Sequence, residues 1–518
     1  MTVDLSWWVA ALVALVPIAI ILVLMIFLRQ SAARAGLVGL VATVVLVFTF
    51  FDIGEATGLR TTVATLGALA EASFTAVTIL WIIFGALCVH HLQVRAGAID
   101  VLERAVGVLS TDPRIIAVLI AWFFALFIEG AAGFGTSVAL AAPFLVSFGF
   151  RPVAAVTIAL VGHSVGVSFG AVGTPILPQI AVTPFSGLEI AGATGLYHVI
   201  LGWVMLVVVM LIVSRQFEDG ELPPRSMVGW VALGAFSFLL PMYGLARWVG
   251  PELPTLGGAV VGAAIFVIAL RIAGRRRQKD DEASVDAPRA GAILRASSPY
   301  LVVIFLILVT RLIPPVQTAL MGLEWEWTLF GEFSGRFQPL YHPGTILVLG
   351  YLLGGLIQRV SLGTMREALE VALKQLVPVM VALVAMLGIS RLMVHSEMIE
   401  ALAEAAATGA GGTWPFFAPW VGVLGTFVTG SATASNILFT DFQMATAQTL
   451  EISPLKTLGA QGFGAAVGNI ICPHNIIAGC ATVGVTGQEG EILRRTLGAC
   501  VVYAVLGGIV AWVWVGWF

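Results

Sequence analysis

The chain has 518 residues, of which 59% are hydrophobic and only 11% are charged, and its mean hydropathy is +1.00. Because a soluble domain carries about 25% charged residues, these values exclude a soluble protein, and a net charge of −3 excludes the basic surface that nucleic-acid binding needs. Apolar runs of about 20 residues, enough to cross a hydrocarbon core, recur throughout. The sequence predicts an all-α polytopic membrane protein with about 12 transmembrane spans and two re-entrant hairpins in inverted-topology repeats.

The first apolar run, Trp7 to Leu28, follows Asp4 and has no basic segment before it, so it is predicted as an uncleaved span and not a signal peptide. Lysine and arginine gather in cytoplasmic loops. The loops on one side of the predicted spans hold 20 of the 26 Lys and Arg residues. This asymmetry places the N-terminus and the C-terminus on the periplasmic or extracellular side.

Residues 1–214 are predicted to form the first repeat. Its hairpin, 115–150, is a 36-residue apolar stretch interrupted by the polar, glycine-rich segment Glu129–Ser137. A broken helix, 153–190, follows, with its break at Gly170–Pro175. Irregular backbone at membrane depth persists only where protein or a water-filled cavity satisfies its N–H and C=O groups, so both breaks are candidate functional segments.

The region 215–297 is predicted to link the two repeats. It contains two spans, near 227–246 and 257–274, and a charged cytoplasmic loop, 275–295, which is expected to be a flexible linker. The external segment 317–342 is rich in aromatic and acidic residues. We expect it to lie as a cap at the membrane interface.

Residues 298–518 repeat the order of the first half. The hairpin 415–450 is again 36 residues long and is interrupted by Thr429–Asn436, and the broken helix 455–485 breaks at Gly468–Pro473. The prolines after the two hairpins lie 302 residues apart, and those at the two later breaks lie 298 residues apart. Basic residues precede the first hairpin but follow the second broken helix, so the repeats are predicted to have opposite orientations, as in secondary transporters.

The four breaks are predicted to meet near the membrane midplane and to form one substrate site. Glycine lets a ligand approach the backbone, and the N-terminus of a half-helix presents free N–H groups that suit a carboxylate. The alternative, helix packing through small residues, explains single glycines but not the hydroxyl and amide groups beside them. The candidate substrate-binding residues are Gly130, Gly133, Gly135, Thr136, Ser137, Thr174, Ser431, Thr433, Ser435, Asn436, Asn469, His474 and Asn475.

Four titratable side chains in or beside these breaks are candidates for proton coupling. A carboxylate at membrane depth costs about 3 kcal/mol unless it is paired or neutral, so Glu129 is predicted to carry a proton or to order the site, with a buried structural carboxyl as the alternative. His474 starts a half-helix and is a candidate for both substrate contact and proton coupling. His163 is a further candidate, with a hydrogen-bonded core histidine as the alternative. Asp441 is a candidate proton relay.

Arg311 and Arg391 lie near the outer ends of apolar segments. Long basic side chains in such positions usually extend to the interface, and this is the expectation for both. The alternative is a positively charged vestibule that attracts an anion.

No pattern predicts an enzyme, a cofactor or a metal site. Walker-type and HExxH motifs are absent from the sequence. Gly162–Gly166 matches the GxSxG nucleophile pattern, but it lies in an apolar helical segment and not between a strand and a helix. The four cysteines form no CxxC pair and are expected to be buried: Cys88, Cys472, Cys480 and Cys500.

At these same breaks the sequence resembles the L-lactate permease family of bacterial transporters, over essentially the whole chain. The resemblance is carried by five blocks: Phe127–Gly135, Phe169–Ile176, Gly250–Pro254, Thr429–Asn436 and Pro473–Gly487. It implies a permease of the bacterial inner membrane that takes up L-lactate, and in some members D-lactate or glycolate, together with protons. The implied partners are a small carboxylate, protons and lipid.

The chain departs from the family's pattern at four positions in the site. Family members have an acidic residue at the position of Ala432, a lysine at Asn469, a serine at Cys472 and a glutamine at His474. An acid and a lysine are lost together, so no unpaired charge remains, but the solute is left open. Two alternatives compete with a proton-coupled monocarboxylate carrier: a Na⁺-coupled carrier of a dicarboxylate or sulfonate, and an anion channel. The oligomeric state and the stoichiometry are left open as well.

Overall fold

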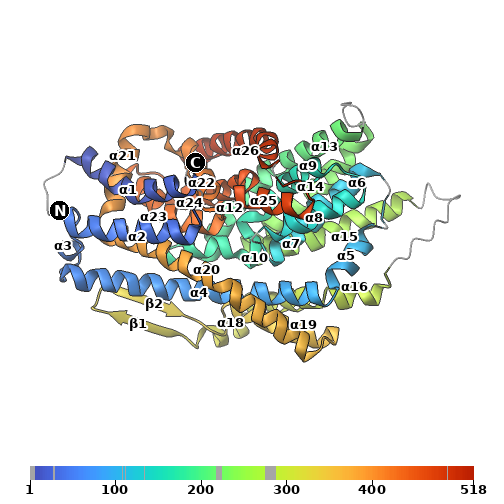
Figure 1. The fold of residues 1–518 in the computed structure, drawn as a ribbon, viewed down its shortest axis with the longest axis horizontal. Helices are drawn as coiled ribbons and strands as arrows, with labels where there is room; N and C mark the ends of the chain where they lie inside the picture. The colour runs from blue at the N-terminus through green and yellow to red at the C-terminus, as the bar shows by residue number, and fades with distance from the viewer. Residues whose placement is uncertain are drawn as a thin grey trace.

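The computed structural model describes residues 6–26, 28, 30–107, 109–110, 112–133, 135–217, 225–274, 288–486 and 488–517. It consists almost entirely of helices (Figure 1). The basic run Arg275–Lys279 of the predicted cytoplasmic loop, Phe134 of the first hairpin and Gly487 lie outside the described residues.

The fold is an all-α membrane architecture, which confirms the predicted helical fold class and its approximate number of spans. Within the described residues, ten segments are long and apolar enough to span a membrane, and two bent helix pairs raise this number to 12. Seven of the ten are single helices: α1 (Trp7–Ile26), α2 (Ala32–Thr49), α4 (Thr61–Arg95), α14 (Arg225–Trp248), α15 (Pro254–Gly274), α20 (Leu362–His395) and α26 (Glu489–Trp517). The bent pairs are α12 (Gly187–Leu201) with α13 (Trp203–Phe217), at 41°, and α16 (Ala290–Ala296) with α17 (Ser298–Leu312), at 63°.

Large apolar side chains point outward from many of these helices. They include Leu12, Val41, Leu66, Phe305 and Leu356, each exposed by more than half of its surface. The exposure of so many large apolar side chains would be unfavourable in water. The outward apolar side chains therefore fit contact with lipid.

Hairpin 1 is formed by α6 (Pro113–Ala117), the π-helical η1 (Val118–Phe124), α7 (Ala125–Ala131) and α8 (Thr136–Ser147). Its tip reverses direction through Gly133 and Gly135, whose φ angles are +59° and +78°. Only glycine adopts such φ angles without a steric penalty, so the glycine cluster fixes the position of the tip. The Trp122 indole N–H anchors the first arm by donating to the Gly234 carbonyl of α14 at 3.1 Å.

Broken helix 1 follows hairpin 1 and comprises α9 (Pro152–His163), the 3₁₀ turn η2 (Ser164–Phe169), α10 (Gly170–Gly173), η3 (Thr174–Ile176) and α11 (Leu177–Val182). Its break contains two non-glycine residues with left-handed backbone, Ala171 (φ 43°) and Val172 (φ 55°). Such residues persist only where the surroundings hold them, and they concentrate at functional segments. Here Ala171 packs against Gly133 of the hairpin 1 tip, where an added Cβ would lie 3.0 Å from the Ala171 Cβ.

Hairpin 2 consists of α22 (Trp414–Thr429) and α23 (Ala432–Thr449), with Gly430 (φ +77°) at its tip and Ser431 as the N-cap of α23. Broken helix 2 comprises α24 (Pro454–Gly468), η5 (Asn469–Ile471) and α25 (Pro473–Thr482). Cys472 is extended (φ −62°, ψ 120°) and separates η5 from α25. The segment therefore presents a new helix N-terminus inside an apolar span.

The hairpins and the broken helices pack crosswise. The second arm of hairpin 1, α8, contacts α25 of broken helix 2, where Gly479 fits between Val138 and Val156. The second arm of hairpin 2, α23, contacts η3 and α11 of broken helix 1. Each hairpin thus closes on the break of the other half of the chain.

The expected interfacial cap contains a β-hairpin that the sequence analysis did not predict. Strands β1 (Trp325–Leu329) and β2 (Phe333–Phe337) pair antiparallel, with Trp325 opposite Phe337. The buried ring of Phe333 sits over Gly67 of α4, where an added Cβ would lie 2.2 Å from the ring. The remaining elements are α3 (Ile53–Thr57), α5 (Ala98–Gly107), α18 (Pro314–Met321), α19 (Pro343–Gln358), α21 (Met398–Ala410) and η4 (Gly411–Thr413).

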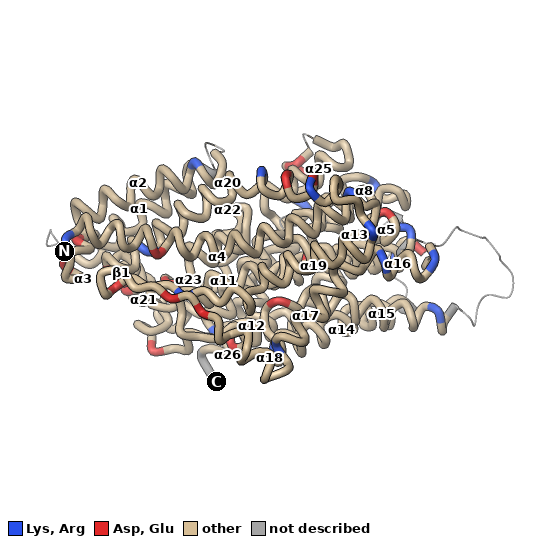
Figure 2. The backbone as a smooth tube through the Cα atoms, turned by 90° about the horizontal axis from the view of Figure 1, so that it is seen from below, with Lys and Arg blue, Asp and Glu red and all other residues tan. Residues whose placement is uncertain are grey.

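Lysine and arginine are unevenly distributed over the molecule. Figure 2 shows blue segments gathered around α5, α8, α13 and α16 at one end of the long axis. The expected clustering of basic residues from separate loops is thus visible in space.

Candidate functional site

The tips of both hairpins reach the start of α25. An added Cβ on Gly135 would lie 2.6 Å from Asn475 Oδ1 and 4.0 Å from His474 Nδ1, and one on Gly430 would lie 3.5 Å from the His474 Cβ. His474 is exposed although it belongs to a membrane-spanning segment. The start of α25 is therefore the point where three predicted site segments meet around an accessible side chain.

Cys472 precedes this half-helix as its N-cap. The backbone N–H groups of His474 and Asn475 face its sulfur. A thiol sulfur is a weak hydrogen-bond acceptor, and the first N–H groups of a helix have no partner within the helix. These two groups therefore retain the capacity to bind an anionic oxygen, which the positive end of the helix dipole favours.

A buried polar chain leads from α25 to broken helix 1. The Asn475 amide donates to Asn469 Oδ1 at 2.6 Å, and the same oxygen lies 3.0 Å from His163 Nε2. His163 Nδ1 lies 2.8 Å from the carbonyl oxygen of Ala159. Both ring nitrogens thus face acceptors, which an imidazolium satisfies. A neutral ring satisfies the same contacts only if both asparagine amides turn over, so the charge of His163 is linked to amide orientation.

Glu129 lies at the end of α7, just before the hairpin 1 tip. It is 4% exposed and has one hydrogen bond among the described residues, from the Ser137 hydroxyl at 2.7 Å. Gly170 of broken helix 1 approaches it so closely that an added Cβ would lie 2.5 Å from Glu129 Oε1. No lysine or arginine pairs with this carboxyl in the described part of the chain. A buried carboxyl without a cationic partner is stable in its protonated form.

The polar side chains of hairpin 2 are joined to one another. Asn436 donates to the carbonyl of Pro175 at 2.8 Å and so ties α23 to the first break. The Gln461 amide of α24 lies 3.3 Å from both Ser435 Oγ and Asn436 Oδ1. Gln443 donates to Gln461 Oε1 at 3.0 Å. Ser435 and Asn436 are therefore committed to holding hairpin 2 against its neighbours.

Several predicted site residues have local partners. Thr136 and Thr174 each donate to a carbonyl three residues earlier, at 2.6 Å, and Ser431 caps α23 by accepting from the Ala434 N–H at 3.4 Å. Thr433 is buried in the first turn of α23. Gly130 contacts α15, where an added Cβ would lie 2.4 Å from the Leu256 nitrogen. These residues therefore shape the tips. Of the predicted site residues in α25, His474 is exposed and Asn475 is buried.

Asp441 lies away from the tips, in a cluster of charges between α4, α20 and α23. Arg391 forms an ion pair with Asp441, which also accepts from Ser390 at 2.9 Å. The other Arg391 Nη lies 3.8 Å from Glu71, and Glu71 lies 2.8 Å from His395 Nε2. No described contact joins Asp441 to Glu129 or His474, and its carboxyl group is instead committed to Arg391 and Ser390.

The expectation that Arg311 and Arg391 extend to the interface is wrong. Their side chains are 5% and 9% exposed and are held in ion pairs. Arg311 contacts Glu252 Oε1 at 2.8 Å and stacks on the Tyr341 ring at 3.5 Å. Glu252 belongs to the block Gly250–Pro254, whose Pro251 backbone touches Gly173 at the first break. Each arginine is paired with an acidic residue that is distant in the sequence. The ion pair satisfies its charge inside the protein, so the side chain does not extend to the interface.

Three buried polar residues that hold the site together were not predicted: Gln443, Gln461 and His198. His198 lies between Ser168 Oγ (2.8 Å) and Tyr503 OH (3.0 Å), and it links η2 to α26. Their signal in the sequence is a polar side chain inside an apolar helix. Within the described ranges, no group of three or more His, Cys, Asp or Glu residues could hold a metal ion, and all four cysteines are free and buried.

The geometry is that of a polytopic membrane protein with paired broken segments around an accessible site. Residues 10–517 match the L-lactate permease family, so the chain belongs to that family. It is 30% identical to an L-lactate permease of Streptococcus iniae over 73% of this chain and 79% of that protein. It is 28% identical to the L-lactate permease and to the glycolate permease GlcA of Escherichia coli K12, over 83% of each chain in both cases.

Two solved transporter structures match most of the chain at low similarity. The Alcanivorax borkumensis YdaH transporter is 16% identical, with a TM-score of 0.47 over 85% of this chain and 86% of that chain. Neisseria gonorrhoeae MtrF is 14% identical, with a TM-score of 0.48 over 88% and 84%. Permeases move solutes across membranes without converting them. Family membership therefore makes this chain a multi-pass membrane transporter and not an enzyme.

Proposed function

We propose that this protein imports a small 2-hydroxy monocarboxylate by proton symport, with L-lactate as the leading substrate and D-lactate or glycolate as further ones. The names of its relatives, L-lactate permease and glycolate permease, support the substrate class. The proposal that the coupling ion is a proton rests on Glu129. This buried carboxyl has a hydroxyl as its hydrogen-bond partner and lies where hairpin 1 meets broken helix 1.

The substrate carboxylate is proposed to bind at the N-terminus of α25. The N–H groups of His474 and Asn475, which face only a weak thiol acceptor, the helix dipole and the His474 ring all favour an anionic oxygen there. Gly135 and Gly430 leave room for the ligand, since neither carries a side chain that would fill the space next to His474. The 2-hydroxyl group is proposed to contact the remaining polar residues of the tips, Ser431 and Thr433 among them.

Proton coupling is proposed to run through Glu129 and His163. A protonated Glu129 is neutral and stable where it is buried. When it ionises, the Ser137 hydroxyl continues to donate to it, and a protonated His163 supplies a countercharge. Because the charge of His163 is linked to the orientation of Asn469 and Asn475, a proton on this pair changes the polar groups that face the substrate at α25. Asp441 stays a weaker candidate because Arg391 already balances its charge.

We further propose that the two halves, 1–214 and 298–518, are inverted repeats joined by 215–297, with the hairpins moving against the rest of the molecule in alternating access. The crosswise packing of each hairpin on the other half's broken helix supports this arrangement. The gathering of basic residues at one end supports a cytoplasmic location for that end in the bacterial inner membrane, with both termini outside.

The test is uptake of labelled L-lactate into proteoliposomes under an inward proton gradient, with Glu129→Gln measured beside the wild type. We expect the wild type to concentrate lactate and Glu129→Gln to lose accumulation by at least about 100-fold, since a group that carries the transported proton has no substitute. Exchange of lactate across the membrane without a gradient should persist in Glu129→Gln, which separates lost coupling from lost binding.

Two outcomes would overturn the proposal. Accumulation that follows an imposed Na⁺ gradient while the proton gradient is clamped would favour a Na⁺-coupled carrier, with dicarboxylates and sulfonates as the solutes to screen. Electrical current without accumulation of any solute would favour an anion channel.

A further inference from the structure

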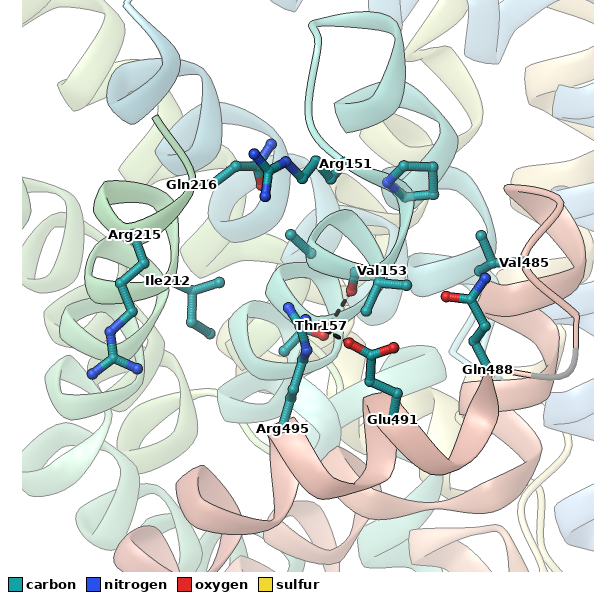
Figure 3. A pocket seen from close by; sticks show the side chains of 12 residues that line it. Arg151, Val153, Thr157, Ile212, Arg215, Gln216, Val485, Gln488, Glu491 and Arg495 are labelled. Carbon is teal, nitrogen blue, oxygen red and sulfur yellow. Dashed lines mark hydrogen bonds and ion pairs between the residues drawn. The ribbon is translucent and has the colours of Figure 1, made fainter. Parts of the chain in front are cut away.

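A cavity of about 590 Å³ lies where the turn before α9, the end of α13 and the start of α26 meet (Figure 3). The hairpin tips do not line it. Its walls come from three elements that are far apart in the sequence. A volume of this size fits a ligand of tens of atoms and is too large for a three-carbon acid. None of its lining residues is a predicted substrate or proton-coupling residue.

Three arginines line the cavity: Arg151 from the turn before α9, Arg215 from α13 and Arg495 from α26. Arg495 donates to Glu491 at 2.5 Å, and Glu491 is the one acidic residue among the described residues that line the cavity. Neither Arg151 nor Arg215 has a hydrogen-bond or ion-pair partner among the described residues. The lining therefore carries a net charge of +2 that no contact among the described residues balances.

A second observation points to a ligand. The side-chain oxygen Oε1 of Gln216 is enclosed and lacks a hydrogen-bond partner in the described structure. It lines the same cavity as Arg151, and Figure 3 shows the two side chains on the same side of the view. An enclosed acceptor without a donor is unfavourable by the desolvation cost of the group, so Gln216 Oε1 is suited to accept a hydrogen bond from a ligand.

We propose that this cavity binds a phosphate-bearing ligand, whose phosphate contacts Arg151 and Arg215 and whose hydroxyl or ammonium group donates to Gln216. The arginine fork matches phosphate oxygens in a bidentate geometry. Basic pockets between membrane helices bind the phosphate of anionic lipid headgroups, and the same chemistry is met by free phosphate or a soluble phosphate ester. The ligand would bridge the first residues of broken helix 1 to α26, which follows broken helix 2.

The experiment compares two variants of the full-length protein that lose equal charge. Arg151→Gln/Arg215→Gln removes two unpaired arginines from the cavity. The control, Arg289→Gln/Arg494→Gln, removes two exposed arginines that do not line it, one of them adjacent to Arg495 on α26. Size-exclusion profiles and helix content are checked first. The single variant Arg215→Gln, which removes no described contact, replaces the double variant if that one does not fold.

Two probes distinguish the sources of the phosphate. The first is phosphatidylglycerol retained by the purified protein from mixed phosphatidylglycerol and phosphatidylcholine bilayers, measured by native mass spectrometry. The second is inorganic phosphate, measured as a thermal shift against chloride at equal ionic strength. We expect the cavity variant to bind one of the two probes about tenfold more weakly than the wild type, with the control unchanged, since a charge-assisted hydrogen bond contributes about that factor.

Loss of phosphatidylglycerol alone supports a lipid headgroup as the ligand, and loss of the phosphate shift supports a soluble phosphate. Equal binding of both probes by the cavity variant and the wild type would overturn the proposal. An equal loss in the cavity variant and the control would overturn it as well, because it would assign the effect to general charge. Neither probe involves transport, so the result is independent of the proposed symport.

Discussion

Two buried carboxyls, Glu129 and Asp441, occupy opposite electrostatic situations in the same membrane domain. Glu129 is 4% exposed and has a hydroxyl as its hydrogen-bond partner. Asp441 is 6% exposed and is paired with Arg391, with Ser390 as a second donor. Their sequence contexts look similar, since both lie in apolar hairpins. What distinguishes them is the partner that the fold delivers from another helix.

The difference indicates how one membrane protein can use acids for two purposes. A carboxylate beside a guanidinium is held in its charged form and binds two helices together, so protonating it is unfavourable. A carboxyl without a cation can be neutral in one step and charged in another, which is the property that a proton carrier needs. The comparison predicts a structural role for Asp441 and a coupling role for Glu129.

The largest expected effect on stability belongs to Asp441→Asn. Removing one partner of a buried pair leaves the other charge uncompensated, which costs about 3 kcal/mol, at the low end of the usual range because Glu71 remains 3.8 Å from Arg391. Denaturant titration in detergent micelles measures this loss. The matched control is Glu370→Gln, which breaks the exposed Arg366–Glu370 pair and should cost less than about 0.5 kcal/mol.

A rescue variant sharpens this prediction. Arg391→Met combined with Asp441→Leu removes both charges, and we expect it to recover most of the lost stability, because apolar replacements of a buried pair are often neutral or better. A double variant as unstable as Asp441→Asn would show that packing, and not the uncompensated charge, determines the cost.

Gly135→Ala is expected to have the next largest effect and to act on the Glu129 side of the comparison. The φ angle of +78° is unfavourable for alanine, and the added Cβ would lie 2.6 Å from Asn475 Oδ1. The strain is about 1–3 kcal/mol, and the displaced Asn475 should weaken lactate binding. Gly149→Ala is the control, since its φ is +87° but an added Cβ has no neighbour within 4 Å. Equal binding by both variants would contradict the proposed contact at α25.

Features that depend on local sequence could be predicted, whereas partners delivered by another helix could not. Apolar run lengths predict the all-α membrane fold, and the helices break where Gly, Pro, Thr and Asn gather, because those residues tolerate or require irregular backbone. The burial of Glu129 follows from its position in an apolar segment. The pairs Arg391–Asp441 and Arg311–Glu252 could not be predicted, since they join residues 50 and 59 positions apart on different helices.

The β-hairpin of the external segment was missed for a different reason. Its signal is local: alternating aromatic residues, Trp325 and Trp327, before a turn at Phe330 and Gly331 with positive φ. In a chain this apolar, the helical period dominates the pattern and hides a short strand signal. Neither the hydrogen bonds of the amides Gln443 and Gln461 nor those of His198 can be inferred from spacing, because their partners are fixed by helix packing.

A pH titration extends the comparison to a second buried cation, Arg311. Burial and the nearby Arg311 charge lower the pKa of His342, in the loop before α19, to about 4. In the unfolded chain His342 takes up a proton near pH 6.5, whereas in the folded chain it stays neutral until about pH 4. Stability should therefore fall as the pH decreases from about 6.5 to about 4. His342→Gln should flatten this part of the stability–pH curve. An unchanged slope in that variant would place the proton uptake elsewhere.

The smallest expected effect is that of Glu129→Gln on stability, and it completes the comparison. Glutamine keeps the shape of the protonated acid, and its carbonyl oxygen can still accept from Ser137. Because no lysine or arginine loses its partner, the free energy of unfolding should change by less than about 1 kcal/mol, against the loss of about 3 kcal/mol in Asp441→Asn. Parallel denaturant titrations of the two variants measure both values. A large loss in Glu129→Gln would mean that the carboxylate is ionised and paired in the resting protein. Glu129 would then have a structural role, like Asp441, and not a role in proton coupling.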